Sequence, residues 1–487
     1  MDRLTEIASH AREAANVLQT LSTSQKSAFL LAIHARLAAA KSQILASNKK
    51  DKDLALPLVE SGKLSSSLYK RLDLEGPGKF DTMLQGIKDI EQLQDPVGKV
   101  AFANKLDNGL ELYRVSCPVG VLLVIFEARP EVVANIAALA IKSGNAAILK
   151  GGKESFHTCE AVSKAIREAM EEVSAATFEE KEGSTGGDNN KAVKHLADAV
   201  QIVESREDID GLLKQDKYID LVIPRGSSAL VKYIQWNTRI PVLGHADGLC
   251  STYVAESAKL ALAQTVVVDA KTTYPAACNS TETLLIHSSH LHDSSKFFPQ
   301  LAKSLVDQGV TLKCDAPALA SLQASDLFKD HQDKIQASNE EDYDTEFLEL
   351  TLAVKTVDSA EDAIRHINEH GSKHTDAILT ENEAEAKRFM AGVDAAGVFW
   401  NASTRFADGF RYGFGAEVGV STNKTHARGP VGLEGLVIYK YQLHGNGQAS
   451  ADYGNEADGK KPYLHERIDV GEKETLGELA RKRQRLE

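Results

Sequence analysis

Cys278 is the residue in this sequence best suited to act as a nucleophile. It lies in the stretch Lys271-Thr-Thr-Tyr-Pro-Ala-Ala-Cys278, which has small residues on both sides of the thiol and leads into the strand-like run 283–286. A turn that contains proline and small residues leaves a thiol accessible, which a nucleophilic thiolate requires. Most unpaired cysteines are instead small buried hydrophobes, so Cys278 alone does not establish catalysis.

Two glycine-rich junctions between a strand and a helix are suited to hold phosphate groups. The strand 146–149 leads into residues 150–155, and the strand 219–223 leads into residues 224–228, which include an arginine. Free backbone N–H groups at the start of a helix can bind a phosphate. Most glycine-rich turns are only turns, so these patterns by themselves are weak indicators of a cofactor site.

A third stretch, residues 401–435, combines many glycines with two arginines and a histidine. Such a surface suits an anionic ligand, because glycine lets the backbone approach closely and arginine binds anions in a fork geometry. A solvated loop is the alternative interpretation. Long irregular stretches inside compact domains are more often functional than idle.

Composition excludes several classes of protein. The formal net charge of −13 argues against nucleic acid or an anionic membrane as the main partner. The five cysteines are scattered and match neither a disulfide framework nor a zinc site. The N-terminus lacks the apolar core of a secretory signal, and the longest apolar run, 119–126, is too short to span a membrane. We therefore expect a cytoplasmic protein with no nucleic-acid or membrane partner.

The elements that must position these residues alternate between strands and helices. Helical periodicity covers residues 1–55 and 64–93, and a hairpin is expected over 96–117. From residue 119 onward strands and helices alternate, which predicts an α/β protein with mostly parallel sheets. The polar segment 175–191 is expected to be a mobile surface loop without chemistry.

From about residue 10 to about residue 445 the sequence resembles the γ-glutamyl phosphate reductase family, within the aldehyde dehydrogenase superfamily. Seven long stretches match the family in the same order, which is too many matches to arise by chance. They are Pro118-Val-Gly-Val to Glu127-Ala-Arg129-Pro130, Lys142-Ser-Gly-Asn145 to Lys150-Gly-Gly-Lys153-Glu-Ser155, Ile223-Pro-Arg225-Gly, Ile240-Pro-Val-Leu-Gly-His245-Ala-Asp247-Gly, the Cys278 loop, Ala363-Ile-Arg-His366 to His374-Thr-Asp376, and Asn401-Ala-Ser-Thr-Arg405 to His426-Ala-Arg428-Gly-Pro430.

The resemblance implies a Rossmann-type NADP(H)-binding domain, an α/β catalytic domain and a small β oligomerisation arm. We assign residues 1–95 and 118–244 to the cofactor domain and 245–410 to the catalytic domain. Residues 96–117 and 411–446 form the arm and a substrate loop. Residues 447–487 are expected to be a partly flexible C-terminal tail with at most a short charged helix.

The reaction that the resemblance implies is NADPH-dependent reduction of L-glutamyl 5-phosphate to L-glutamate 5-semialdehyde with release of phosphate, in proline biosynthesis. The Cys278 thiolate would attack the acyl phosphate, and hydride would reduce the resulting thioester. Both steps place negative charge on the carbonyl oxygen, which needs hydrogen-bond donors. The superfamily asparagine that supplies one donor is missing beside Glu127, so Arg129 or Asn135 would replace it, or Arg129 would hold the phosphoryl group.

A second departure from the superfamily concerns the base that activates water in hydrolytic aldehyde dehydrogenases. In this sequence His245-Ala-Asp247 lies in the register of that glutamate. Because a reductase must protect its thioester from water, the loss of the base fits reduction. Because of its place in the register of that glutamate, His245 is included with Cys278 and Arg129 among the predicted catalytic residues.

The resemblance also assigns binding residues. Lys150 would contact the adenosine ribose, Lys153 would attract a 2′-phosphate and so favour NADPH, and Glu346 would bind the nicotinamide ribose. Gly151, Arg225, Gly226 and Ser227 complete the predicted cofactor site. The predicted substrate-binding residues are Asn401, Ser403, Arg405, His426 and Arg428.

Three histidines, 366, 370 and 374, have a spacing that could indicate a metal site. Gly371 ends the helix before the last of them and the family uses no metal, so we expect no metal site and local structural roles. A homo-oligomer, dimer or tetramer, is implied, and a transient complex with a separate glutamate 5-kinase is a hypothesis. The alternatives are a reductase of another acyl phosphate or of an acyl-CoA, and a catalytically silent scaffold of the same fold.

Overall fold

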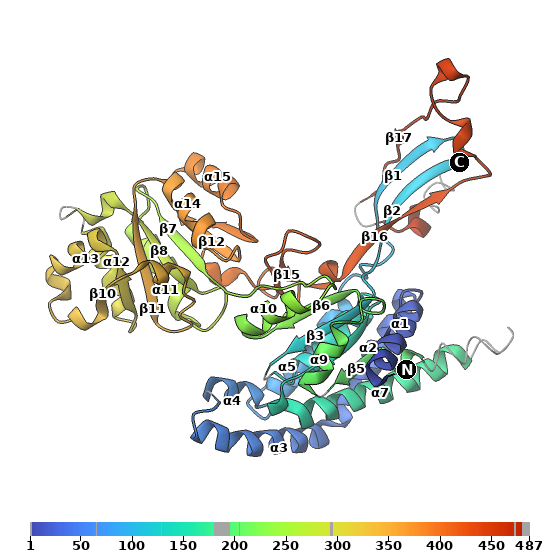
Figure 1. Ribbon diagram of the computed structural model, residues 1–487, viewed down its shortest axis with the longest axis horizontal. Coiled ribbons are helices and arrows are strands. Elements are labelled where there is room, and N and C mark those ends of the chain that lie inside the picture. The colour runs from blue at the N-terminus through green and yellow to red at the C-terminus, as the bar shows by residue number, and fades with distance from the viewer. Residues whose placement is uncertain are drawn as a thin grey trace.

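The computed structural model describes residues 2–64, 66–127, 129–179, 195–203, 205–292, 296–471 and 474–479. They form two α/β parts and a projecting β arm, each built around its own sheet (Figure 1). The predicted α/β class with parallel sheets is confirmed. Residues 180–191 of the predicted surface loop lie outside the described residues, and residues 175–179 continue a helix.

The first part contains a parallel sheet of order β5-β4-β3-β6. Every residue of β3 is buried, which explains its unbroken apolar sequence, since helices cover a parallel sheet on both faces. Its strands are β3 (Val121–Phe126), β4 (Ala146–Lys150), β5 (Val200–Val203) and β6 (Leu221–Arg225). Its helices are α1 (Arg3–Leu18), α2 (Thr23–Ala39), α3 (Lys41–Glu60), α4 (Ser66–Leu72), α5 (Lys79–Gln92), α6 (Val132–Lys142), α7 (Phe156–Glu179), α9 (Arg206–Leu212) and α10 (Ser228–Asn237).

The second part contains a seven-stranded sheet of order β10-β9-β11-β8-β7-β12-β13, and all its strand pairs are parallel. Its central strands β7, β8 and β12 adjoin one another, which matters for the site described below. The strands are β7 (Cys250–Val254), β8 (Thr281–His287), β9 (Thr311–Cys314), β10 (Ile335–Ala337), β11 (Thr351–Val357), β12 (Thr375–Leu379) and β13 (Gly397–Trp400). The helices are α11 (Leu260–Thr272), α12 (Phe297–Val306), α13 (Ala316–Gln323), α14 (Ala360–His370) and α15 (Glu383–Gly392).

The arm is an antiparallel sheet of order β16-β2-β1-β17 that extends away from both α/β parts (Figure 1). Strands β1 (Val100–Asp107) and β2 (Leu110–Pro118) form the predicted hairpin. The turn of the hairpin consists of Asn108 and Gly109, and Gly109 takes the positive φ of 70° that such a tight turn favours. Strand β16 (Val437–His444) pairs with β2 along its whole length.

The segment expected as a C-terminal tail differs from the prediction, because much of it returns to the arm. Strand β17 (Glu466–Arg467) pairs with β1, and Leu479 is buried in a cluster with Val100, Tyr113 and Val115. Burial of these apolar side chains holds the returning chain, which weak local propensity could not predict. The basic residues 480–487 lie outside the described part of the chain.

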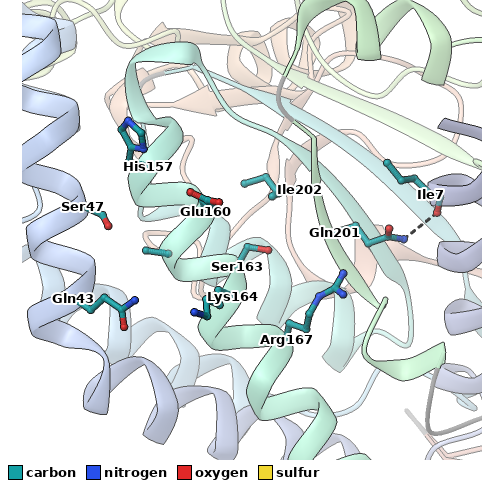
Figure 2. A pocket seen from close by; sticks show the side chains of 11 residues that line it. Ile7, Gln43, Ser47, His157, Glu160, Ser163, Lys164, Arg167, Gln201 and Ile202 are labelled. Carbon is teal, nitrogen blue, oxygen red and sulfur yellow. Dashed lines mark hydrogen bonds between the residues drawn. The ribbon is translucent and has the colours of Figure 1, made fainter. Parts of the chain in front are cut away.

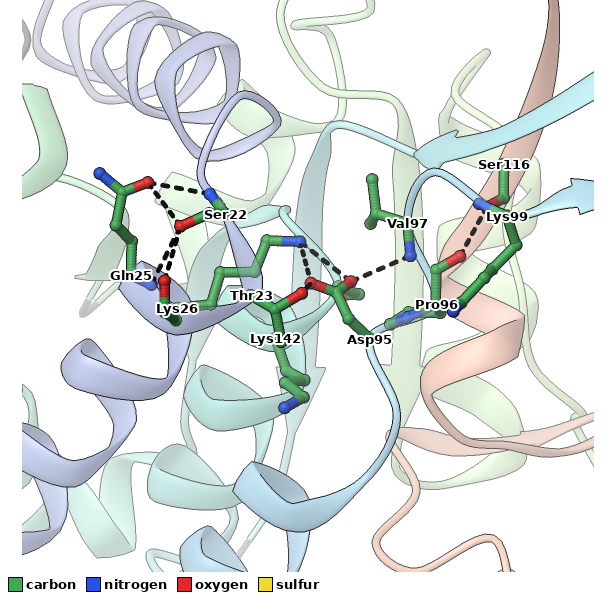
Figure 3. Close-up of polar contacts among 12 residues, drawn as sticks. Ser22, Thr23, Gln25, Lys26, Asp95, Pro96, Val97, Lys99, Ser116 and Lys142 are labelled. Atoms are coloured by element: carbon green, nitrogen blue, oxygen red, sulfur yellow. Dashed lines mark hydrogen bonds and ion pairs between the residues drawn. The ribbon is translucent and has the colours of Figure 1, made fainter. Parts of the chain in front are cut away.

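A buried ion pair fixes the point at which the chain enters the arm (Figure 3). Lys26 in α2 is almost fully buried, and its Nζ lies 3.0 Å from Asp95 Oδ2. Asp95 Oδ1 also accepts a hydrogen bond from Val97 N at 3.0 Å, and Ser116 Oγ donates to Pro96 O at 2.6 Å. These contacts tie both strands of the hairpin to the helical layer.

A small ladder of β14 (Gly419–Ser421) and β15 (Gly429–Val431) lies in the predicted substrate loop.

Among the described helices, none is by itself long and apolar enough to cross a membrane. Helices α2 and α3 pass that test of length and composition only as a pair, and they are bent by 67° at their junction.

Candidate active site

Cys278 lies in the loop between α11 and β8 and is half-buried. The short helix Thr404–Phe406 and the residue after it hold this loop in place. Asn279 Nδ2 donates to Ala407 O at 2.9 Å, and Thr404 Oγ1 donates to Asn279 O at 2.7 Å. The thiol is therefore accessible on a fixed backbone, as a nucleophile requires.

The backbone of Gly248 passes unusually close to the cysteine loop. A Cβ atom on Gly248 would lie 2.3 Å from Cys278 O and 2.6 Å from Glu346 Oε1, so no other residue fits without displacing them. Glu346, predicted to bind the nicotinamide ribose, thus lies at the base of the nucleophile loop. Burial raises the pKa of this carboxyl group.

Two imidazoles face the thiol. A ring nitrogen of His245, a ring nitrogen of His374 and Cys278 Sγ all lie within 4.8 Å of one another. The rings of the two histidines meet edge to face with their centroids 4.8 Å apart. His245 Nδ1 lies 3.0 Å from Val420 O and must be the donor, because a carbonyl oxygen only accepts. This leaves Nε2 of a neutral His245 free to accept a proton.

His374 lies beside the nucleophile, a position that the sequence did not predict. Its side chain is fully buried, and its Nε2 has no hydrogen-bond partner among the described residues. Its Nδ1 lies 2.9 Å from Thr375 Oγ1 and 3.8 Å from Cys250 Sγ. The helix ends before His374, as the sequence indicated: α14 ends at His370, and His374 directly precedes β12.

The two earlier histidines belong to a different environment. His366 packs edge to face on Tyr343 at a centroid distance of 5.2 Å, and His370 Nδ1 lies 2.9 Å from Asp344 Oδ1. Burial lowers the pKa of His366 to about 4, so this ring is neutral at physiological pH.

Two arginines, Arg225 and Arg405, lie close enough to the nucleophile to interact with its charge. Burial lowers the pKa of both Arg225 and Arg405, and the negative charge of a Cys278 thiolate opposes that shift at both residues. Arg129 acts on Arg225 as a nearby like charge, while Glu417 acts on it as an opposite charge. Arg225, predicted as a cofactor residue, therefore also belongs to the electrostatic environment of Cys278, and the site suits an anionic substrate.

The predicted cofactor residues gather at one edge of the smaller parallel sheet. In the strand pairing Ile125 is opposite Lys150 and Phe126 is opposite Arg225, so the carboxyl ends of β3, β4 and β6 meet. The chain runs from β3 to β4 and β5 on one side and returns to β6 on the other, and nucleotides bind at this kind of switch point. Lys153 is exposed beside this edge.

The residues at this edge, where a dinucleotide would bind, are closely packed. A Cβ atom on Gly226 would lie 2.9 Å from Glu127 Oε2, and Ser227 N donates to the same oxygen at 3.3 Å. Lys150 is buried, its Nζ donates to Gly151 O at 2.6 Å, and burial lowers its pKa. The edge thus offers two lysines to a phosphate-bearing ligand, while the Glu127 carboxylate already occupies the backbone N–H of Ser227.

Only one of the five predicted substrate-binding residues is linked to the nucleophile by a described interaction, and that residue is Arg405. The side-chain amide of Asn401 forms two hydrogen bonds with the backbone of Thr380. Thr380 N donates to Asn401 Oδ1 at 2.9 Å, and Asn401 Nδ2 donates to Thr380 O at 3.0 Å. Ser403 Oγ accepts a hydrogen bond from Arg405 N at 3.3 Å, so it caps a short helix. Both side chains are thus hydrogen-bonded to the protein's own backbone, and their predicted contact with the substrate stays a prediction.

The two residues at the end of the substrate loop are also engaged elsewhere. His426 Nε2 donates to Gly435 O at 2.7 Å, and Arg428 Nη2 pairs with Asp394 Oδ1 at 3.0 Å. An arginine already paired with a carboxylate is poorly suited to clamp a second anion. Asn135, one of the proposed oxyanion donors, has its Oδ1 packed against Gly86 in α5.

A surface pocket of about 590 Å³ lies away from this chemistry, between α1, α3, α7 and β5 (Figure 2). None of the predicted cofactor, substrate or catalytic residues lines it. Its walls mix basic, acidic and amide side chains, such as Lys164, Glu160 and Gln43. Concavity alone does not identify the reactive centre here; the meeting of nucleophile, imidazoles and guanidinium groups does.

No protein-family model matches the sequence. The chain is 53% identical over 467 residues to the probable gamma-glutamyl phosphate reductase of Schizosaccharomyces pombe, covering 96% of this chain and 98% of that protein. It is similar to the crystal structure of gamma-glutamyl phosphate reductase from Thermotoga maritima, with a TM-score of 0.81, 34% identity, and coverage of 92% of this chain and 100% of that one. An acetylating aldehyde dehydrogenase from Geobacillus thermoglucosidasius shares the fold alone, with a TM-score of 0.59, 16% identity, and coverage of 92% and 97%.

Proposed function

The chain belongs to the γ-glutamyl phosphate reductase family, whose reductase role lies in proline biosynthesis, and we propose that it reduces L-glutamyl 5-phosphate to L-glutamate 5-semialdehyde with NADPH through a thioester on Cys278. The observation that carries this proposal is the meeting of Cys278, His245 and His374 within 4.8 Å on a fixed loop. Two guanidinium groups act on the same thiolate. A nucleophile, a proton acceptor and positive charge are what acyl transfer from an acyl phosphate requires.

In the first step the Cys278 thiol loses its proton and attacks the acyl carbon. His374 is the candidate acceptor, because one of its ring nitrogens lies within 4.8 Å of the thiol and its buried Nε2 has no hydrogen-bond partner among the described residues. The C–S bond forms as the C–O bond to phosphate breaks. Arg225 and Arg129 are the groups we expect to neutralise the departing phosphate, since each is a cation and the two act on one another.

The developing oxyanion requires donors that are already in place. The Cys278 backbone N–H is the first candidate, since the hydrogen bonds from Asn279 and to its carbonyl hold this backbone rigidly. The Asn279 side-chain amide donates one of its two hydrogens to Ala407 O at 2.9 Å. Arg129 is the alternative candidate for the second donor, in which case Arg225 alone neutralises the phosphate.

A nicotinamide dinucleotide would lie along the carboxyl ends of β3, β4 and β6, where Lys150, Gly226 and Ser227 gather. When bound, it supplies the hydride that reduces the thioester to the aldehyde and frees the thiolate. Lys153 favours NADPH over NADH because an exposed ammonium group at this edge would pair with the 2′-phosphate.

We also propose that the arm joins copies of this chain into a homo-oligomer. Strand β16 is the outer strand of the arm sheet, and it exposes four large apolar side chains: Ile438, Tyr439, Tyr441 and Leu443. An unpaired edge with exposed apolar side chains is a template for pairing with another chain. A transient complex with a glutamate 5-kinase and a cytoplasmic location stay predictions.

The test is NADP⁺ reduction by L-glutamate 5-semialdehyde, with and without inorganic phosphate, by the wild type, Cys278→Ala and the control Cys117→Ala. Cys117 is a half-buried thiol in arm strand β2. We expect phosphate-dependent NADPH formation that is lost in Cys278→Ala and kept in Cys117→Ala. Turnover with coenzyme A in place of phosphate would favour an acyl-CoA reductase, and no turnover with either would favour the scaffold.

A further inference from the structure

Arg71, at the end of α4, reaches from the helical layer of the cofactor-side part to the loop that carries the nucleophile. Its Nη2 donates to Tyr274 Oη at 3.0 Å. Tyr274 lies four residues before Cys278 in that loop, and Ala277 N donates to Tyr274 O at 3.1 Å, so one turn joins them. The contact therefore links a helix far away in the sequence to the immediate neighbourhood of the thiol.

The ring of Tyr274 is in contact with a second arginine, Arg405. The guanidinium carbon of Arg405 lies 5.8 Å from the centroid of the Tyr274 ring, a cation–π arrangement. Tyr274 thus has one guanidinium at its hydroxyl and another over its ring. Since the Tyr274 hydroxyl accepts from Arg71, its own hydrogen remains available to donate.

Both guanidinium groups have unused donors. The Nε atoms of Arg71 and Arg405 are buried and lack a hydrogen-bond partner in the described part of the chain. Arg428 Nε is unpartnered as well, but Arg428 Nη2 pairs with Asp394 Oδ1 at 3.0 Å, whereas neither Arg71 nor Arg405 forms an ion pair with a described carboxylate. Leaving a buried donor on a cation unsatisfied is costly, which points to an anionic ligand that supplies the missing acceptors.

The charges near Arg405 support the same conclusion. Arg411 acts on it as a like charge, and Asp269 and Asp408 act as opposite charges. Neighbouring acids therefore stabilise the cation but leave its donors free. An incoming carboxylate would complete the arrangement, because a carboxylate matches the guanidinium fork.

We propose that Arg71, Arg405 and the Tyr274 hydroxyl bind the α-carboxylate of the amino-acid substrate, which makes Arg71 a specificity-determining residue. This inference rests on the proposed function. Three carbon atoms separate the α-carboxylate of L-glutamyl 5-phosphate from the carbonyl that Cys278 attacks, so the two ends of the substrate need two separate anion sites. Arg225 and Arg129 serve the phosphate end, and Arg71 and Arg405 serve the amino-acid end.

The consequence is selectivity against acyl phosphates and aldehydes that lack a carboxylate. A site built to hydrogen-bond a polar group rejects an analogue without it, because its own buried donors are then left unpaired. We expect kcat/KM of the wild type for L-glutamate 5-semialdehyde to exceed that for butanal by about 100-fold or more.

The test compares Arg71→Ala with Lys70→Ala, in the phosphate-dependent reverse reaction, on L-glutamate 5-semialdehyde and on butanal. Lys70 is the exposed neighbour of Arg71 at the same helix end, so its substitution removes the same charge. Arg71→Ala should raise KM for the semialdehyde about tenfold or more with a small change in kcat, which lowers the selectivity ratio by a similar factor. Lys70→Ala should leave both quantities near the wild-type values. An equal loss for both aldehydes, or an unchanged KM, would overturn the inference.

A second measurement does not depend on turnover. Calorimetry with L-glutamate and Cys278→Ala protein should detect binding that Arg71→Ala removes and Lys70→Ala keeps. If the wild type gives no phosphate-dependent turnover but this binding pattern holds, the proposed reaction fails and the carboxylate site stands. If turnover occurs but the pattern is absent, the carboxylate site fails alone.

Discussion

The Nζ atom of Lys271 lies 2.6 Å from Glu282 Oε2, and both side chains are buried, with exposed fractions of 0% and 2%. The two residues flank the loop that carries Cys278, since Lys271 ends α11 and Glu282 lies in β8. Glu282 Oε1 also accepts a hydrogen bond from Leu348 N at 3.3 Å, which connects the pair to the segment of Glu346. Burial raises the pKa of Glu282 to about 7, although Lys271 opposes the shift.

Removing one member of this pair should strongly destabilise the protein. Glu282→Gln or Lys271→Met leaves a buried charge without its partner, which costs about 3–5 kcal/mol. The double substitution Lys271→Met with Glu282→Leu should cost less than either single one. Urea unfolding measures all three, and Lys259→Ala, which breaks the exposed pair with Glu381, should cost less than about 1 kcal/mol. A double variant less stable than both single variants would contradict this account.

His374→Gln should slow the chemistry at Cys278 without unfolding the protein. Losing a positioned proton acceptor lowers kcat/KM by about 10²- to 10⁴-fold. The alkylation rate of Cys278 by iodoacetamide at fixed pH should fall as well, because less thiolate forms. His370→Gln is the matched control, since that histidine contacts Asp344 and not the thiol. Equal alkylation rates in wild type and His374→Gln would show that His374 does not activate the cysteine.

Asp376→Asn should flatten the dependence of stability on pH. Asp376 is fully buried, and burial raises its pKa to about 7, well above the usual range of a carboxyl group. Between about pH 4 and pH 7 the folded state binds the extra proton, so the free energy of unfolding falls as pH rises through this window, by on the order of 4 kcal/mol from this group. The amide keeps an oxygen for the hydrogen bond from Ser251 N but does not ionise.

The measurement for Asp376→Asn is the urea midpoint at a series of pH values across that window. The exposed Asp330 offers the control Asp330→Asn, which should follow the wild-type profile. The prediction fails if the Asp376→Asn protein loses stability with rising pH as steeply as the wild type does.

Lys153→Glu should reverse the preference between the two nicotinamide cofactors. Loss of a charged contact with the 2′-phosphate should raise KM for NADPH about 10- to 100-fold, while KM for NADH falls or stays constant. Lys164→Glu makes the same charge change at an exposed position on α7, in the wall of the pocket of Figure 2. Steady-state kinetics with both cofactors decide the matter, and a rise in KM of equal size for both would exclude recognition of the 2′-phosphate.

Charges on the outer strand of the arm should break the oligomer. Tyr441 and Leu443 are 59% and 56% exposed in the single chain, and burying each in a contact would contribute about 1.5–3 kcal/mol. Tyr441→Asp with Leu443→Asp should therefore shift sedimentation toward the single chain. Trp236→Asp, at an 83% exposed position on α10, tests whether any loss of exposed apolar surface has this effect. An unchanged sedimentation coefficient in the arm variant would remove β16 from the interface.

The sequence alone was sufficient for the α/β class and for the family. Strand–helix alternation and the seven family-like stretches led to Cys278 as the nucleophile candidate, and the structure places the thiol accessibly on a fixed loop. The resemblance assigned Glu346 to the nicotinamide ribose, and Gly248 approaches both Glu346 and Cys278. The fold class and the family were predicted correctly because they depend on local patterns that the chain carries residue by residue.

The sequence did not reveal His374, Arg71 or the occupied state of Arg428. His245, Cys278 and His374 precede strands β7, β8 and β12, and parallel strands that adjoin in a sheet bring their amino ends to one edge. The order of strands in a sheet depends on packing of the whole domain and not on local periodicity, so the sequence could not place His374 beside the thiol. Residue types and local pattern thus determined which chemistry was available, while the tertiary structure decided which side chains meet, because only packing sets the distances on which proton transfer and ion pairing depend.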